Sequence, residues 1–372
     1  MYLKELSLVN FKNYDQLQLS FSSKINFFAG NNGEGKTNLL DAIYYLSLTK
    51  SYFNNIDSQN IRHNEDFFVI QGEYTRQEIP ENIYCGVKRG SRKSFRRNGK
   101  EYSRFSEHVG LLPVVMVSPA DSSLITEGSE ERRKFMDAVI SQYDVTYLDK
   151  LIRYNRALVQ RNVLLKDFAR KDNFSSSSLD IWSEQLTSLG EYIYKIRSGF
   201  IRELVPVFQQ YYTTISGQKE KVQLKLQSQL EDSGMEELLR NALDKDRLLQ
   251  YTTAGTHKDD LILMLGDHPI RTTGSQGQQK TYLVALKLAK FDYIRRINGF
   301  NPILLLDDVF DKFDSHRVKK IIELVAHDSF GQIFITDTSR DRIRMVLDDL
   351  ETEYKVFTVD DGRVTETENR EP

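Results

Sequence analysis

The sequence contains very little cysteine, no long apolar run and no excess of positive charge. Cys85 is the single cysteine among 372 residues, which excludes an intrachain disulfide and favours a reducing compartment. The longest apolar runs, such as 303–306, are far too short to span a membrane. The chain starts Met-Tyr-Leu-Lys-Glu, with charged residues where a secretory signal is apolar. We therefore expect a cytoplasmic protein.

The formal net charge is −2, which excludes a protein that is basic overall. An anionic partner must therefore meet a local basic patch rather than the whole surface. The sequence also lacks a cluster of histidine and cysteine with the spacing of zinc ligands. A hydrophobic content of 40% and a charged content of 28% are typical of a soluble globular protein. The length suits one large domain or two to three ordinary ones.

A glycine-rich segment between an expected strand and an expected helix is the most informative feature. It has the P-loop form G-x-x-x-x-G-K-[ST] and comprises Gly30, Asn31, Asn32, Gly33, Glu34, Gly35, Lys36 and Thr37. An apolar run, 25–29, precedes it, and residues 38–46 have the apolar spacing of a helix. In such a loop the backbone N–H groups close on a polyphosphate, Lys36 reaches the outer phosphates, and the Thr37 hydroxyl ligates Mg²⁺. The alternative is a glycine-rich turn without a ligand.

Two carboxylates follow another apolar strand late in the chain. Residues 302–306 are apolar, and Asp307 and Asp308 come directly after them. This is the Walker B form, in which a buried strand delivers Asp307 to Mg²⁺, directly or through water. Asp308 lies where a carboxylate orients the attacking water, so Lys36, Asp307 and Asp308 are the candidate catalytic residues. The alternative is that the two aspartates cap the next helix.

A second glycine-containing helix start precedes the Walker B strand. Residues 274–281 read GSQGQQKT and run into an apolar helix expected over 282–294. A serine and a glycine at this point form a second helix terminus that can bind an anion. One such helix start does not identify a ligand by itself.

The strongest local concentration of positive charge lies in a predicted hairpin, 94–102, with Asn98-Gly99 at its turn. Between Lys88 and Arg104 there are eight lysines and arginines and one acidic residue. The side chains that would contact a phosphate backbone are Arg92, Lys93, Arg96, Arg97 and Lys100. The alternative is a solvated hairpin without a partner.

The pattern becomes mainly helical near residue 122. Long helical stretches are expected at about 129–142, 146–171 and 179–212, and strand character returns near 261–265. The sequence predicts a discontinuous head, 1–121 and 251–372, and a helical arm, 122–250. The arm lacks the sustained heptads of a long coiled coil. His257 lies in a polar turn. It could contact a phosphate, ligate a metal or have a structural role.

The order of these motifs resembles an ABC-type ATPase head of the SMC class and, within that class, the RecF family of bacterial DNA replication and repair proteins. The resemblance covers essentially the full length. It is carried by residues 30–38, 118–121, 131–137, 154–162, 255–260, 275–281 and 306–310. It implies an α/β fold, in which an ABC-type P-loop ATPase head with a mixed sheet and helices carries a mainly helical inserted lobe.

The resemblance also implies a role for the second helix start. Ser275, Gly277 and Gln278 match the S-x-G-Q signature and would bind the γ-phosphate of ATP held by a second subunit. ATP would then join a homodimer, and hydrolysis would release it. Asp314 matches the D-loop aspartate of this class.

Three departures from the wider ABC pattern concern catalysis. Residues 118–121 occupy the place of the Q-loop glutamine, and Thr336, Asp337 or Thr338 replaces the switch histidine. Asp308 stands where most ABC proteins have a glutamate. Because aspartate is one methylene shorter, we expect slow hydrolysis and a long-lived ATP state.

The resemblance implies ATP and Mg²⁺ as cofactors and a weak, DNA-stimulated ATPase activity. It implies binding to duplex DNA and to single-strand/double-strand junctions at gaps, and work with RecR and RecO in loading RecA. Three alternatives stay open: another SMC-like head with different partners, a non-DNA P-loop enzyme such as a small-molecule kinase, and a module that binds ATP without hydrolysing it.

Overall fold

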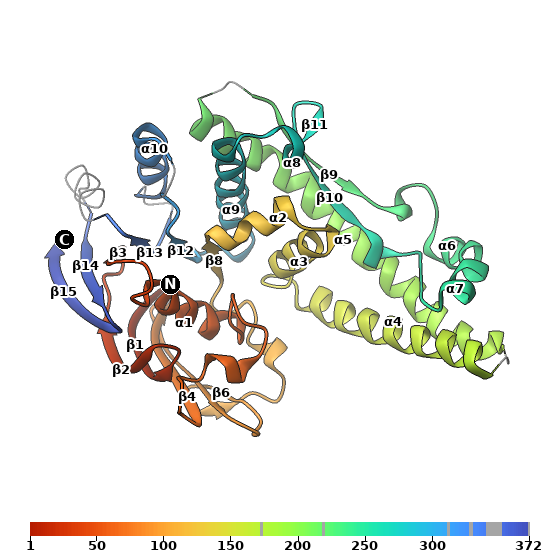
Figure 1. The fold of residues 1–372 in the computed structure, drawn as a ribbon, viewed down its shortest axis with the longest axis horizontal. Helices are drawn as coiled ribbons and strands as arrows, with labels where there is room; N and C mark the ends of the chain where they lie inside the picture. Colours follow the sequence, from red (N-terminus) through yellow and green to blue (C-terminus); the bar gives the residue numbers. More distant parts are fainter. Residues whose placement is uncertain (172–173, 218–219, 311–312, 327–329, 340–351, 371–372) are drawn as a thin grey trace. The chain divides into compact units, whose positions relative to one another are not determined.

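The computed structural model describes residues 1–171, 174–217, 220–310, 313–326, 330–339 and 352–370. Within these residues the chain forms two compact units (Figure 1). Unit 1 comprises Met1–Asp121, Tyr211–Gln218 and Lys280–Pro372, and unit 2 comprises Ser122–Gln210 and Lys219–Gln279. The boundary predicted between head and arm, at residues 121 and 122, agrees with the first boundary between the two units. Residues 251–279, which the prediction placed in the head, belong to unit 2.

Unit 1 contains two six-stranded sheets. The first is antiparallel, with the order β2-β1-β4-β5-β6-β7. Its strands are β1 (Tyr2–Phe11), β2 (Tyr14–Ser20), β4 (Phe67–Arg76), β5 (Ile79–Lys88), β6 (Ser94–Arg97) and β7 (Lys100–Glu101). The predicted hairpin is β6–β7, and its turn residues Asn98 and Gly99 both have positive φ, as a tight two-residue turn requires.

The second sheet has the order β15-β14-β3-β13-β12-β8 and is parallel except for β15 (Figure 1). Its strands are β3 (Ile25–Ala29), β8 (Val114–Val117), β12 (Ile303–Asp307), β13 (Ile333–Asp337), β14 (Tyr354–Asp360) and β15 (Arg363–Arg370). Every residue of β3, β12 and β13 is buried, as is typical of parallel strands covered on both faces. Because these strands are parallel, the P-loop, Asp307 and Asp337 follow them at the same edge of the sheet.

The helix after the P-loop, α1 (Lys36–Leu48), forms the centre of the unit 1 core. It packs against β1, β4 and β5 of the first sheet and against β8, β12 and β13 of the second. Its apolar residues lie all around the helix rather than on one stripe, which fits burial between two layers. The other helices of this part are α9 (Gln276–Asn298), which begins at the end of unit 2, and α10 (Ser315–Ala326). The predicted α/β fold with mixed sheets and helices is confirmed.

Unit 2 is mainly helical, and the three predicted long helices are present. Its helices are α2 (Ser123–Thr126), α3 (Ser129–Ile140), α4 (Val145–Lys171), α5 (Ser176–Ser216), α6 (Met235–Asn241), α7 (Leu243–Leu249) and α8 (Ile270–Thr273). A three-stranded antiparallel sheet completes it, with the order β11 (His268–Pro269), β10 (Asp260–Leu265), β9 (Val222–Gln227). Strand β9 was not predicted. A search of the described helices finds none that is both long and apolar enough for a membrane span.

Candidate nucleotide-binding site

The P-loop turns from β3 into α1 through backbone conformations that favour glycine. Gly33 and Gly35 have φ of 89° and 115°. A Cβ at Gly35 would also lie 2.4 Å from Asn13 Nδ2, so the loop backbone approaches its neighbours closely. Helix α1 begins directly after Gly35 and receives no side-chain cap. Its first N–H groups, which have no partner inside the helix, therefore face an anion site.

The turn between β1 and β2 braces the P-loop. Tyr14 Oη donates to Gly35 O at 3.0 Å, and Asn13 Nδ2 donates to Glu34 O at 3.1 Å. Asn38 Nδ2 in turn donates to Asn13 Oδ1 at 2.8 Å. Asn13 and Tyr14 therefore hold the P-loop in place, a role that the sequence did not predict. The P-loop motif specifies the residues that face the ligand and not those that support the loop.

Lys36 folds back over the loop. Its Nζ donates to Gly30 O at 2.7 Å and to Asn31 O at 2.6 Å. Burial lowers the pKa of Lys36, and the carboxylates of Asp308, Asp307, Asp337 and Glu34 oppose that shift. An ammonium has three donors, so the two carbonyl bonds orient Lys36 and leave a donor for an anionic ligand.

Thr37 and the Walker B aspartate meet directly. Thr37 Oγ1 donates to the Asp307 carboxylate at 2.8 and 3.1 Å. Burial raises the pKa of Asp307, while hydrogen bonds from Thr37 and Thr336 act in the opposite direction. A hydroxyl and a carboxylate next to an anion-binding helix start are the oxygen donors that Mg²⁺ takes beside phosphates. The donor set therefore fits a magnesium nucleotide.

Thr336 connects the carboxylate of Asp307 to the backbone of Asp308. Its Oγ1 donates to Asp307 Oδ1 at 2.9 Å and accepts from the backbone N–H of Asp308 at 2.9 Å. Asp308 has a φ of 46°, a left-handed conformation that turns the chain sharply after β12. Of the three residues predicted at the switch position, Thr336 contacts this pair. Asp337 instead accepts from the N–H of Ser339 at 2.7 Å, and Thr338 is exposed.

Residues 118–121, at the place of the Q-loop, form hydrogen bonds and an ion pair with other residues of unit 1. Asp121 Oδ2 accepts from the N–H of Ser118 at 2.9 Å, and Asp121 Oδ1 forms a buried ion pair with Lys287 at 2.5 Å. Tyr52 Oη also donates to Asp121. Asp314, at the D-loop position, accepts from the N–H of Arg317 at 2.9 Å at the start of α10.

The signature segment forms a reciprocal cap at the start of α9. The N–H of Ser275 donates to Gln278 Oε1 at 2.6 Å, and the N–H of Gln278 donates to Ser275 Oγ at 3.3 Å. This is the capping-box arrangement of serine with a glutamine three residues later. Gln278 Nε2 also donates to Glu220 Oε1 at 2.5 Å, and Gly277 lies in the first turn. The side chain of Ser275 is exposed.

The basic hairpin divides into two groups of side chains. Lys93 is partly buried: its Nζ pairs with Asp57 at 2.9 Å and donates to Thr49 O at 2.6 Å. Arg97 Nε donates to the buried carboxylate of Glu81 at 2.8 Å, and this contact, with Asn98, holds the pKa of Glu81 below its usual value. Arg92, Arg96 and Lys100 are exposed.

His257 has a structural environment. Its Nε2 lies 3.0 Å from Thr252 O, so Nε2 carries a proton, and its Nδ1 lies 2.8 Å from Tyr154 Oη. Burial lowers the pKa of His257 to about 4. Across the described residues, no group of three or more His, Cys, Asp and Glu side chains is arranged to hold a metal ion.

Comparison with known proteins agrees with this geometry. The family model described as RecF/RecN/SMC N terminal domain matches residues 2–365. The DNA replication and repair protein RecF of Phocaeicola vulgatus is 55% identical over 368 residues, which are 98% of each chain. The chain belongs to the RecF family. The RecF protein of Flavobacterium johnsoniae, 48% identical over 96% of this chain and 100% of its own length, is a more distant member.

Solved structures give the same assignment. A structure of the recombination mediator protein RecF with ATP, in the RecFOR pathway, matches with a TM-score of 0.88 at 30% identity and covers 99% of this chain and 98% of its own. An SMC head bound to the C-winged helix domain of ScpA matches with a TM-score of 0.58 at 17% identity, over 99% of this chain and 97% of its own. The similarity to the SMC head concerns the fold alone: this RecF family member and the SMC head share the ABC-type head fold.

Proposed function

We propose that this RecF family member is an ATP-dependent DNA-binding protein of replication and recombinational repair, in which ATP joins two copies of the chain. The observation that carries the proposal is the contact of Thr37 with Asp307 at 2.8 Å beside the uncapped start of α1. It joins two motifs that are 270 residues apart in the chain. Full-length similarity to RecF proteins, one of them solved with ATP, supports the same reading.

The site works by positioning and charge. The N–H groups of the P-loop and Lys36 would bind the outer phosphates. Thr37 and Asp307 would hold Mg²⁺, which supplies neutralisation of phosphate charge when bound. Asp308 would orient the attacking water and accept its proton. Its backbone is held by Thr336, so Thr336 sets the direction of the Asp308 side chain.

The signature segment would complete this site from a second copy. Ser275 and Gln278 satisfy each other in the present structure, but the bond from the N–H of Gln278 to Ser275 Oγ is long, at 3.3 Å. An incoming γ-phosphate is a stronger partner for both groups than they are for each other. Each copy would therefore contain only part of its active site, and hydrolysis would allow the two copies to separate.

The DNA-binding part of the proposal rests on the family and on the exposed cations of the β6–β7 hairpin. Arg92, Arg96 and Lys100 are free to reach a phosphate backbone, whereas Lys93 and Arg97 hold acidic partners inside unit 1. We extend the proposal to duplex DNA and gap junctions as the target and to RecO, RecR and RecA as the partners, because relatives act in the RecFOR pathway.

The ATPase rate measured against protein concentration tests the proposal. With Mg²⁺, turnover per chain should rise with concentration and rise further with duplex DNA. Ser275→Arg should bind ATP and stay monomeric in sedimentation, and Asp308→Asn should form an ATP-stabilised dimer without turnover. A turnover per chain that stays constant from dilute to concentrated protein contradicts the dimer, and undiminished hydrolysis by Asp308→Asn removes Asp308 from its role.

A further inference from the structure

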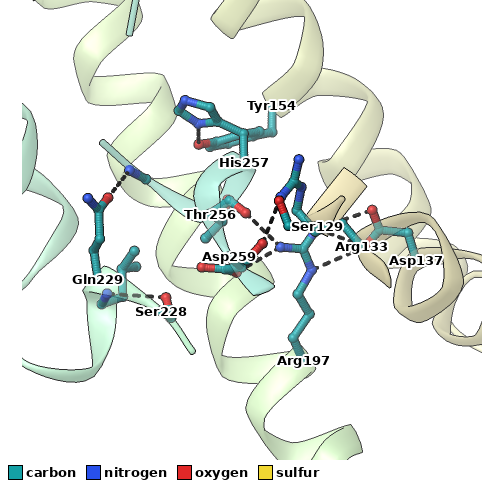
Figure 2. A network of polar contacts seen from close by, with 12 residues as sticks. Ser129, Arg133, Asp137, Tyr154, Arg197, Ser228, Gln229, Thr256, His257 and Asp259 are labelled. Carbon is teal, nitrogen blue, oxygen red and sulfur yellow. Dashed lines mark hydrogen bonds and ion pairs between the residues drawn. The ribbon is translucent and has the colours of Figure 1, made fainter. Parts of the chain in front are cut away.

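A cluster of charged side chains in unit 2 takes no part in the proposed nucleotide site. It contains three arginines and three aspartates: Arg132, Arg133, Arg197, Asp137, Asp259 and Asp260. Arg197 lies between Asp137 and Asp259, with N–O distances of 2.9 and 2.7 Å, and Figure 2 shows this arrangement. Arg133 donates to Ser129 Oγ and to Asp259 O, both at 2.7 Å (Figure 2). The cluster joins residues 131–137 to residues 255–260, two segments singled out in the sequence.

Arg132 connects this cluster to the end of α2. Its Nε and one terminal nitrogen donate to the two oxygens of Asp260 at 2.7 and 2.9 Å. Its other terminal nitrogen donates to Leu124 O at 3.2 Å and to Glu127 O at 2.9 Å. One guanidinium therefore holds both the first residue of β10 and the end of α2.

These two elements are the supports of α8, which leads into the signature. Strand β10 runs through β11 into α8, and α2 and α3 pack next to each other while α2 packs against α8. The N–H of Gly274 donates to Ile270 O at 2.9 Å, and Gln279 Nε2 donates to Gly274 O at 3.0 Å. Ser275 follows directly. Both supports of the segment 274–278 therefore meet at Arg132.

The energetics favour a positioning role over a stabilising one. The side chains of Arg132 and Asp260 are 14% and 20% exposed, and ion pairs at such sites add little net stability because desolvation offsets attraction. The planar guanidinium fixes the directions of its N–H groups, which here donate to one carboxylate and two backbone carbonyls. Lysine carries the same charge but cannot make this set of bonds.

We propose that Arg132 is a positioning residue for the signature segment 274–278. It fixes α2 and the start of β10 relative to each other, and so holds α8 in the place from which Ser275 and Gln278 meet the γ-phosphate of a second copy. The inference rests on the proposed function, because that function assigns the phosphate contact to Ser275 and Gln278.

Arg132→Lys tests the inference, with Arg133→Lys as its matched control. The two residues are neighbours on α3, and the hydrogen bonds of Arg133 go to Ser129 and Asp259 rather than to α2. We expect Arg132→Lys to raise hydrogen exchange of residues 270–278 in the nucleotide-free protein and to weaken ATP-dependent dimerisation about tenfold in sedimentation. Binding of a fluorescent ATP analogue should stay within twofold of the wild type. Arg133→Lys should lower the melting temperature and leave the exchange of 270–278 and the dimer unchanged.

Two outcomes overturn the inference. The first is wild-type exchange of 270–278 and wild-type dimerisation in Arg132→Lys. The second is an equal effect of both variants on exchange and dimerisation, because that is the result of a general contribution to stability. Should Arg132→Lys fail to fold, Asp260→Asn keeps an acceptor for the fork and is expected to change the same peptides less strongly. A wild type that does not dimerise with ATP refutes the proposed function, while the exchange of 270–278 still decides the role of Arg132.

Discussion

At the scale of single residues, hydroxyl groups organise the carboxylates of the candidate site. Thr37 and Thr336 both donate to Asp307, and Thr336 also accepts from the N–H of Asp308. Asp307 is buried, and a buried carboxylate keeps its charge only while it receives such bonds. The threonine hydroxyls therefore hold Asp307 in the state that can bind a cation.

The hydroxyl of Thr336 is predicted to matter more for turnover than for ATP binding, because Thr37 still donates to Asp307. Thr336→Val keeps the shape of the side chain but leaves the N–H of Asp308 without its acceptor, so the Asp308 carboxylate loses its direction. We expect turnover to fall about tenfold to hundredfold in single-turnover assays, as for other lost positioning groups. Thr336→Ser is the control and should retain most of the activity. Equal rates for the valine and serine variants contradict the prediction.

His257 is predicted to contribute to the acid lability of unit 2. Its pKa is about 4 in the folded chain because the ring is buried, and about 6.5 in an unfolded one. Between these values the unfolded chain binds more protons, so the free energy of unfolding falls as the pH falls through this window. In His257→Gln the free energy should be lower at pH 7, because the contacts of the ring are lost, and should fall less steeply towards pH 4.

Urea unfolding at pH 7, 5.5 and 4.5 measures this slope, with the single tryptophan, Trp182 on α5, as the probe of unit 2. His108 in unit 1 has a similarly lowered pKa of about 4. His108→Gln is therefore the control and should leave the slope seen by Trp182 unchanged. The same slope in His257→Gln and the wild type is inconsistent with a buried neutral ring.

At the scale of elements, the β6–β7 hairpin shows why a run of charge cannot be taken as one surface. Side chains of a strand alternate between its two faces, so neighbouring cations in the sequence have different partners. On β6, Arg97 pairs with Glu81, whereas its neighbour Arg96 lies over Tyr84 and remains exposed. Lys93, which directly precedes β6, pairs with Asp57 and packs over the rings of Tyr45 and Phe105. We therefore propose Arg92, Arg96 and Lys100, which are exposed, as the main candidates for DNA contact.

The hairpin prediction concerns the salt dependence of DNA binding. Arg96→Gln and Lys100→Gln should each reduce the slope of log K against log salt by about one, because each removes one phosphate contact. Arg97→Gln is the matched control: Arg97 holds Glu81, so this change should affect stability and not the slope. Duplex binding at a series of salt concentrations gives all three slopes. An unchanged slope in Arg96→Gln and Lys100→Gln identifies a solvated hairpin without a partner.

At the scale of the whole molecule, unit 1 contains the complete P-loop and Walker B pair, while the signature lies in unit 2. Nucleotide binding and dimer formation should therefore be separable. On the proposed function, a monomer should bind ATP through unit 1 alone, and the signature should act only when a second copy is present.

Calorimetry of wild-type and variant protein tests this separation. At 100 times the dissociation constant, Mg²⁺-ATP should stabilise the chain by about 2.7 kcal/mol. At concentrations where the wild type is monomeric, Ser275→Arg should show the same rise in melting temperature. Lys36→Ala should show little or none, because the anion site has lost its ammonium. A smaller rise in Ser275→Arg than in the wild type contradicts a complete binding site in unit 1.

The sequence by itself determined the features that local pattern encodes. The P-loop, the Walker B strand, the Asn98-Gly99 turn and the long helices α3, α4 and α5 all follow from spacing within a few turns or a few residues. Strand β9 was missed although Val222, Leu224 and Leu226 alternate with polar residues, because the surrounding helical pattern was extended over it.

Only the tertiary structure decided which side chains meet. Thr336 with Asp307, Lys93 with Asp57, and Arg132 with Asp260 join residues that lie from 29 to 128 positions apart. Periodicity records which face of an element is buried and carries no information on what covers that face. Partner choice depends on how the strands and helices pack, and packing is a property of the whole folded chain.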